Sequence, residues 1–224
     1  MFFIDIFQSL SYIVNNQVHK NRIQEQRQVI SNKHLNQLTQ AAKQLGASAS
    51  VVITSKEIQV KNNLAILCNG EYTCPNYGLS ANCSPHVKGP DEFRKWQAQS
   101  KYSITVKIEI PTSVMFSDER KGVMQLLHQI VSAVEKNAIK LDFKNSKAFA
   151  SGSCKELFCA DYEKCCILAE NKPCRHIEVA RPSMSGFGID VIQLMKSSGW
   201  SANKAKDTDE RDEISWVAGL ILLI

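Results

Sequence analysis

The stretch "KYSITVKIEI", residues 101–110, decides the fold that the sequence predicts. Aromatic and β-branched residues alternate there with polar ones, and this period of two is typical of a strand. Pro111 ends the run, because proline cannot donate to the hydrogen-bond ladder of a sheet. The stretch therefore predicts a β-strand, and helical patterns flank it on both sides.

Helices are predicted before and after this strand. Residues 91–100, behind Pro90, form the first pattern. Ser117 or Asp118 can cap a second and longer helix. Apolar residues recur in it every three or four positions, which marks a face that packs on a core. They are Val123, Leu127, Ile130, Val131, Val134 and Ala138.

The rest of the chain repeats this alternation of strands and helices. Asp190 predicts the start of another helix, with Gln193 at the capping-box position and Gly199 as its end. Further strands are predicted at "SASVVITS" (48–55), "EIQVKNNLAILC" (57–68, with a turn at Lys61–Asn63), "KAFASG" (147–152) and "WVAGLILLI" (216–224). The expected class is α/β or α+β, a mixed sheet with flanking helices.

Eight cysteines fall into two groups, with some seventy residues between them that contain none. The first group has the spacing C-x5-C-x8-C and the second C-x4-C-x5-C-C-x7-C. Core cysteines would be scattered, so the clustering predicts two cysteine-rich metal loops. Each loop is expected to follow a strand, so both could meet on one edge of the sheet. The members are Cys68, Cys74 and Cys83, then Cys154, Cys159, Cys165, Cys166 and Cys174.

The spacing indicates a metal but leaves its identity open. Neither loop has the paired C-x2-C turns of common structural zinc sites, nor the ferredoxin run. Wide spacings with proline and glycine favour an iron–sulfur cluster, [4Fe–4S], with one or two centres. The second loop offers four ligands and a spare, and only one of Cys165 and Cys166 is expected to ligate. The first offers three, so its fourth position falls to His86, a cysteine of the other loop or a substrate.

Two other functions stay open. One is a zinc-binding structural or interaction module. The other is a thiol-dependent enzyme in which Cys83 is the nucleophile and His86, three residues on, is its base. We interpret Arg175 and Arg181 as groups that bind loop carbonyls or neutralise cluster charge.

The motifs "CPNYG…NCSPH" and "GSC…C…C…PCRH…ARPSMSGFGIDV" together resemble the uncharacterised cysteine-rich "predicted metal-binding proteins" of archaea and anaerobic bacteria. The resemblance covers residues 35–224. It departs from the family pattern at Ser84, where proline is usual. The resemblance implies a set of metal ligands: Cys68, Cys74, Cys83, Cys154, Cys159, Cys166 and Cys174, with Cys165 and His86 as further candidates. It implies no substrate and no catalytic residue.

The charge and the two ends of the chain limit what partners and location can be expected. The net charge of the 224 residues is +5, too small to predict a nucleic-acid partner. Residues 1–30 are predicted to be an N-terminal extension, helical, and residues 31–224 the cysteine-rich domain. The apolar ends are too short for a membrane span, and no signal peptide is expected, so the predicted location is the cytoplasm. The expected role is electron transfer, or a redox or sulfur-handling reaction, with a redox partner or small substrate left unnamed.

Overall fold

The computed structural model describes residues 32–70, 73–201 and 214–224. Leu38–Ile224 form one compact unit, and the fold and sites below belong to it. The predicted extension, residues 1–30, lies outside the described residues. A helix that ends at residue 44 leads into the sheet, and Gly46 follows it with a φ of +112° that favours glycine.

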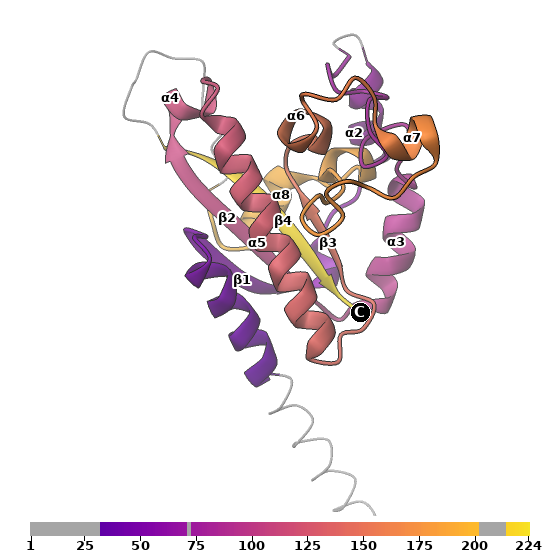
Figure 1. The fold of residues 1–224 in the computed structure, drawn as a ribbon. Helices are drawn as coiled ribbons and strands as arrows, with labels where there is room; N and C mark the ends of the chain where they lie inside the picture. The colour runs from indigo at the N-terminus through magenta and orange to yellow at the C-terminus, as the bar shows by residue number, and fades with distance from the viewer. Residues whose placement is uncertain (1–31, 71–72, 202–213) are drawn as a thin grey trace, which may run out of the picture. The chain divides into compact units, whose positions relative to one another are not determined.

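Four strands form the sheet at the centre of this unit: β1 (Ala49–Thr54), β2 (Tyr102–Pro111), β3 (Lys147–Ala150) and β4 (Ile214–Leu223). Their order is β1-β2-β4-β3, and every neighbouring pair is antiparallel. The stretch around residues 101–110 is a strand, as its alternating pattern predicts, and its place between β1 and β4 makes it an inner one (Figure 1). The predicted class, a sheet with flanking helices, is confirmed.

Helices cover both faces of the sheet. α5 (Arg120–Lys140) lies across one face with the predicted apolar stripe turned inward (Figure 1). Gly219 on β4 permits this close approach, because an added Cβ would lie 2.5 Å from Val131 Cγ1. α3 (Gly89–Gln99), the 3-10 turn η3 (Met184–Phe187) and α8 (Val191–Ser197) pack on the other face. There Phe149 meets Phe93 and Phe187 with ring centroids 5.2 and 5.1 Å apart.

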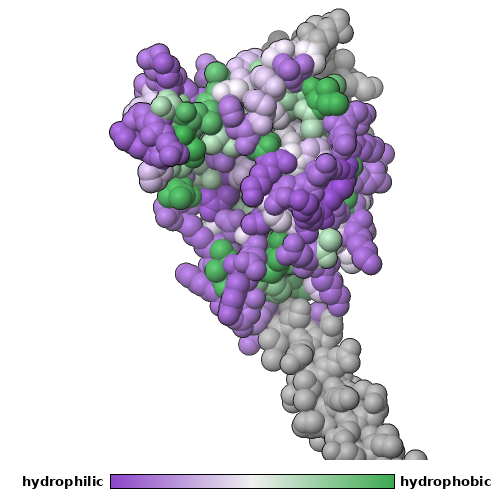
Figure 2. Space-filling view, turned by 90° about the vertical axis from the view of Figure 1, so that its right-hand side faces the viewer, coloured by the Kyte–Doolittle hydropathy of each residue, from purple (hydrophilic) through white to green (hydrophobic). Residues whose placement is uncertain are grey.

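Short helices carry the cysteine loops: α2 (Asn62–Ile66), η2 (Leu67–Asn69), α6 (Cys154–Phe158) and α7 (Cys166–Glu170). Two further short helices follow β1 and β2: η1 (Ser55–Glu57) and α4 (Thr112–Met115). α2, α6 and α7 gather at one end of the sheet (Figure 1), with α7 on the face that also carries α3. Side chains on that face are mostly hydrophilic, and apolar ones form small separate groups (Figure 2).

The strand predicted over residues 57–68 is wrong, and with it the expectation that the first cysteine loop follows a strand. The segment makes only one bridge, Val60 to Ile189, and then becomes α2 and η2. The Lys61 N–H donates to the carbonyl of Gly188 rather than to a strand neighbour. Pairing with the η3 turn, which is distant in sequence, decides this conformation. The second cysteine loop does follow a strand, β3.

Candidate metal centre

Three thiols line one cavity of about 440 Å³, which we call the three-cysteine pocket. Cys68 lies on η2, and Cys74 and Cys83 lie in turns of the first loop. The turns are built by backbone hydrogen bonds, in which the Cys74 N–H donates to the Cys68 carbonyl at 3.1 Å. The Cys83 carbonyl accepts from the N–H groups of His86 and Val87. The loop therefore presents three sulfurs to the same space.

The surroundings of Cys68 disfavour its thiolate. Burial raises the pKa of Cys68, the Ser84 hydroxyl lowers it, and the neighbouring Cys74 and Cys83 raise it further. Such a set resists holding three negative charges without a cation among them. Metal binding supplies that cation and displaces the protons.

His86 does not join this set. Its Nε2 lies 3.2 Å from the Gly78 carbonyl, its side chain is exposed, and it is not among the residues that line the pocket. Cys83 in turn donates a weak hydrogen bond to the Ser153 hydroxyl at 3.5 Å. The structure thus places both side chains against other partners, and it brings Glu156 and Arg120 to the pocket instead.

The second loop surrounds a much smaller space of about 20 Å³, which we call the five-cysteine cavity. All five of its cysteines line it: Cys154, Cys159, Cys165, Cys166 and Cys174. The wall is completed by Ser80, Ala81 and Asn82, which belong to the first loop. Nothing in the sequence singles out these three residues, because serine and asparagine are common in any turn.

The thiols in this cavity are held as a mutually repelling group. Burial raises the pKa of Cys154 to about 11, Ser80 and Asn82 offset part of the shift, and Cys83 and Cys174 add to it. Burial also raises the pKa of Cys159, and Cys174 adds to the shift while Arg175 opposes it. The thiolates of Cys154 and Cys159 are therefore favoured only when a positive centre lies among them.

Cys165 differs from its neighbour Cys166. Burial raises the pKa of Cys165, but the backbone N–H groups of Ala81, Leu168 and Ile167 lower it more, so the net shift is downward. Cys165 is the N-cap of α7, which explains why unpaired N–H groups face its sulfur. Cys166 is buried, and its thiol donates to the Pro173 carbonyl at 3.2 Å.

In the metal-free protein, Cys165 is expected to react with iodoacetamide faster than Cys166 or Cys154. The thiolate is the reacting species, and the lowered pKa of Cys165 increases its thiolate fraction near neutral pH. Mass spectrometry of peptides after timed alkylation measures the order. Preferential labelling of Cys166 would contradict it, and unfolded protein, in which the rates should converge, is the control.

The two cysteine sets lie back to back. Cys83 faces the three-cysteine pocket, while its neighbour Asn82 faces the other cavity and donates to Cys154 Sγ at 3.6 Å. Ser153 likewise lines the pocket, and the adjacent Cys154 lines the cavity. Two dipeptides, one from each loop, thus form a shared wall.

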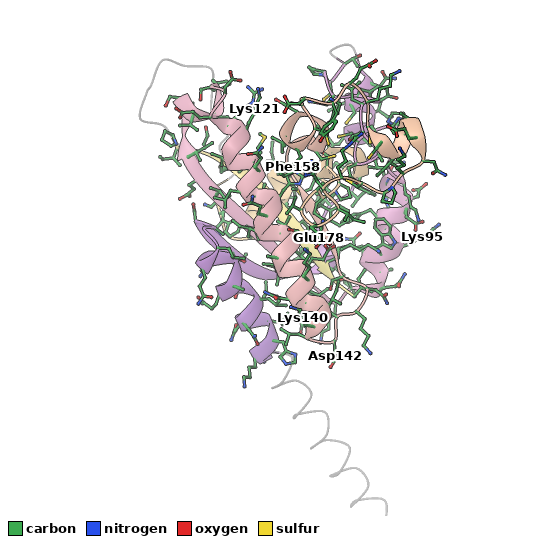
Figure 3. All side chains as sticks on the ribbon, viewed as in Figure 1. Lys95, Lys121, Lys140, Asp142, Phe158 and Glu178 are labelled. Atoms are coloured by element: carbon green, nitrogen blue, oxygen red, sulfur yellow. The ribbon has the colours of Figure 1, made fainter. Side chains whose placement is uncertain are left out.

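Charged and aromatic side chains brace the second loop. Arg175 donates to the Lys164 carbonyl at 3.4 Å and lies over the Tyr162 ring at 4.1 Å. The Cys174 sulfur accepts from the backbone N–H of His176 at 3.4 Å. Phe158 stacks on His176 beside α5, and Glu178, also beside α5, pairs with Lys136 (Figure 3). The Lys136–Glu178 pair and the Arg181–Glu135 pair thereby fix the loop to α5 at two points.

His128 on α5 adds a third contact. Its side chain is fully buried, its Nδ1 accepts from the backbone N–H of Arg181 at 3.1 Å, and its ring meets the edge of Phe158. Burial lowers the pKa of His128 to about 4; the backbone at Ser151 and Val179 offsets part of the shift, and Arg181 adds to it.

Stability is expected to fall as the pH drops from about 6.5 towards 4. The unfolded chain takes up a proton at His128 near pH 6.5, whereas the folded chain does so only near pH 4. The loss is about 1.4 kcal/mol per pH unit within this window. Denaturant unfolding at pH 7, 6 and 5 should show a flatter profile for His128→Asn, whose amide oxygen can replace Nδ1 as an acceptor. Parallel profiles for both proteins, at equal metal content, would contradict the prediction.

Among the described residues, no three His, Cys, Asp or Glu side chains converge on a point that could hold one metal ion. The same part of the chain contains no helix long and apolar enough to cross a membrane.

Comparison with known proteins gives one match. Residues 51–223 match the family described as "Predicted metal-binding protein (DUF2284)". Neither the curated proteins nor the solved structures contain a match. The matched range includes all eight cysteines. It also includes all four strands, apart from the start of β1. This chain therefore belongs to the DUF2284 family of predicted metal-binding proteins.

Proposed function

We propose that this protein is an iron–sulfur protein of the cytoplasm that transfers electrons between two cluster sites. The observation that carries the proposal is the five-cysteine cavity, where five thiols face one another with no carboxylate in the wall. A donor set of thiolates alone suits iron–sulfur clusters and zinc, and not hard cations. All eight cysteines are free, as a reducing compartment requires.

The cavity wall also suits a cluster through its hydrogen-bond donors. Ser80 is 1% exposed, and its hydroxyl, which lowers the pKa of Cys154, has no other hydrogen-bond partner among the described residues. Backbone N–H groups point at Cys165 and Cys174. Donors of this kind stabilise sulfide and thiolate and set the potential of a cluster. We assign Cys154, Cys159, Cys165 and Cys174 as the ligands of a [4Fe–4S] cluster, with Cys166 as the spare cysteine.

A second cluster would be held by Cys68, Cys74 and Cys83. The shared wall of Asn82–Cys83 and Ser153–Cys154 gives electrons a short route between the two ligand sets. It consists of two weak hydrogen bonds, one from each residue of the first pair to the second, and of the two peptide units. When bound, each cluster can accept or release one electron. The chain's own contribution is to hold the two ligand sets back to back and to shield the buried one from water.

The alternative is a zinc module. A single zinc ion needs four ligands at about 2.0–2.3 Å around one point. The cysteines line two separate cavities instead, and the five cysteines of the second exceed the four ligands that one zinc ion takes.

The test is anaerobic purification followed by analysis of iron, zinc and acid-labile sulfide. The proposal expects a brown protein with iron and sulfide in equal amounts, and a reduced form with an electron paramagnetic resonance (EPR) signal. Coupling between two reduced clusters should broaden that signal. A colourless protein with stoichiometric zinc and no sulfide would overturn the proposal in favour of the zinc module.

A further inference from the structure

The three-cysteine pocket contains far more space than its sulfurs need. Its volume of about 440 Å³ compares with about 20 Å³ for the five-cysteine cavity. Pockets for small molecules begin at about 300 Å³. The extra space lies between the first cysteine loop, the start of α5 and the start of α8.

One wall of the pocket is apolar. It is made by side chains from α2, η2, α5 and α8: Leu64, Leu67, Met124, Val191 and Ile192. Leu67 is 65% exposed, so this part of the lining is open to solvent. This wall can bury the carbon skeleton of a ligand.

The lining also contains charged side chains, and these charges are already paired. Glu156 accepts from Arg120 at 3.3 Å with one oxygen and from Asn76 at 3.1 Å with the other. Asp190 accepts from Lys61 at 2.7 Å. No surplus positive charge is left in the lining to meet an anion, and the three thiolates of a metal set add negative charge. The lining therefore disfavours an anionic ligand.

We infer that this pocket binds a small uncharged or cationic thiol, whose sulfur completes the metal coordination begun by Cys68, Cys74 and Cys83. The inference rests on the proposed function, because it needs a metal at that set. Three thiolates leave a fourth position on a cluster, and His86 is bonded elsewhere. A soft metal site prefers sulfur as its fourth ligand. The apolar wall then takes the body of the thiol.

The experiment titrates the reduced, cluster-loaded protein with three thiols of equal donor but different charge: 2-mercaptoethanol, cysteamine and 3-mercaptopropionate. A saturable change in the EPR spectrum is expected with the first two, and affinity for the acid should be at least about tenfold weaker. Glu156→Gln removes one negative charge and should narrow that difference. Equal affinity for all three thiols, or tighter binding of the acid, would overturn the inference.

A pocket-filling variant locates the binding. Ile192→Trp occupies the apolar wall from a partly exposed position and should weaken 2-mercaptoethanol binding by at least about tenfold with unchanged iron content. Ile177→Trp is the matched control, because Ile177 is 63% exposed and outside the lining. Equal binding by both variants would overturn the inference.

Metal analysis separates the two levels of failure. Suppose that Cys68→Ser lowers the iron content but no thiol changes the EPR spectrum of the wild-type protein. The inference then fails, and the proposed second cluster stands. If Cys68→Ser leaves iron and sulfide unchanged, the second cluster is absent and both fail.

Discussion

Replacing Cys154 or Cys174 by serine is expected to remove about half of the iron and acid-labile sulfide of the protein. Each is assigned as a ligand of the cluster in the five-cysteine cavity, and serine oxygen is a poor substitute for thiolate on iron. Cys68→Ser should remove the other half, because the three-cysteine pocket would hold the second cluster. Iron and sulfide assays, visible absorbance and EPR of anaerobically purified variants measure these losses.

The adjacent pair Cys165 and Cys166 supplies the matched control within the same cavity. Cys165→Ser should behave like Cys154→Ser, because backbone N–H groups favour the Cys165 thiolate. Cys166→Ser should keep its full metal content, since the Cys166 thiol is bonded to the Pro173 carbonyl. The sequence favoured Cys166 as the ligand, so this comparison also tests which of the two assignments is right.

Two outcomes would count against the assignment. Full metal content in both Cys154→Ser and Cys174→Ser would mean that the second loop is not a metal site. Complete loss in every single variant would mean that both loops hold one shared centre, which the hydrogen bonds from Asn82 to Cys154 and from Cys83 to Ser153 would then explain.

The sheet could be predicted because its strands have strand-like residue patterns. β4 is a continuous apolar run with both faces covered, and β2 alternates apolar and polar residues, although its polar Ser103 and Thr105 are buried as well. The apolar stripe of α5 and the N-cap of α8 could also be predicted from the sequence. At the start of α8, the Asp190 carboxylate accepts from the Gln193 N–H at 3.0 Å, as the capping pattern predicts.

The segment before Cys68 could not be predicted from its own residues. "EIQV" has strand character, but its only partner is the single bridge to Ile189, and Lys61 bonds to Gly188. Gly188 has a φ of +68°, and an added Cβ would lie 2.3 Å from the Lys61 carbonyl oxygen. This contact joins residues that are far apart in the sequence, so it could not be predicted from the strand propensity of residues 57–60.

The sequence predicted which cysteines belong together, but not how the two groups are arranged in space. Clustering of cysteines indicated two groups, and the structure places each group around its own cavity. Ser80 and Asn82 of the first loop help to line the cavity of the second loop. Their position depends on how the two loops cross, which the sequence does not show. The back-to-back contact and the apolar wall depend on the same crossing. Arg175 and Arg181 do bind loop carbonyls, as expected from their positions.

Arg181→Met is expected to lower the free energy of unfolding by about 3–5 kcal/mol. The Arg181 side chain donates to Glu135 at 2.6 Å, and the two side chains are only 11% and 14% exposed. The other Glu135 oxygen accepts from the Ala148 N–H at 2.7 Å. The pair therefore ties the exit of the second cysteine loop to α5 and β3, and loss of the arginine leaves a buried carboxylate without its cation.

A double-mutant cycle separates this coupling from a general packing loss. Glu135→Gln removes the charge but keeps an oxygen for Ala148, so adding it to Arg181→Met should cost less than the two single changes summed. Denaturant unfolding at equal metal content measures the four proteins, with Lys172→Met, at an exposed ion pair, as the variant that should not change stability. Additive losses would mean that the buried pair has no coupling. Because the metal loop leaves the core at Arg181, Arg181→Met should also release iron to a chelator faster than the wild type does, whereas Lys172→Met should not.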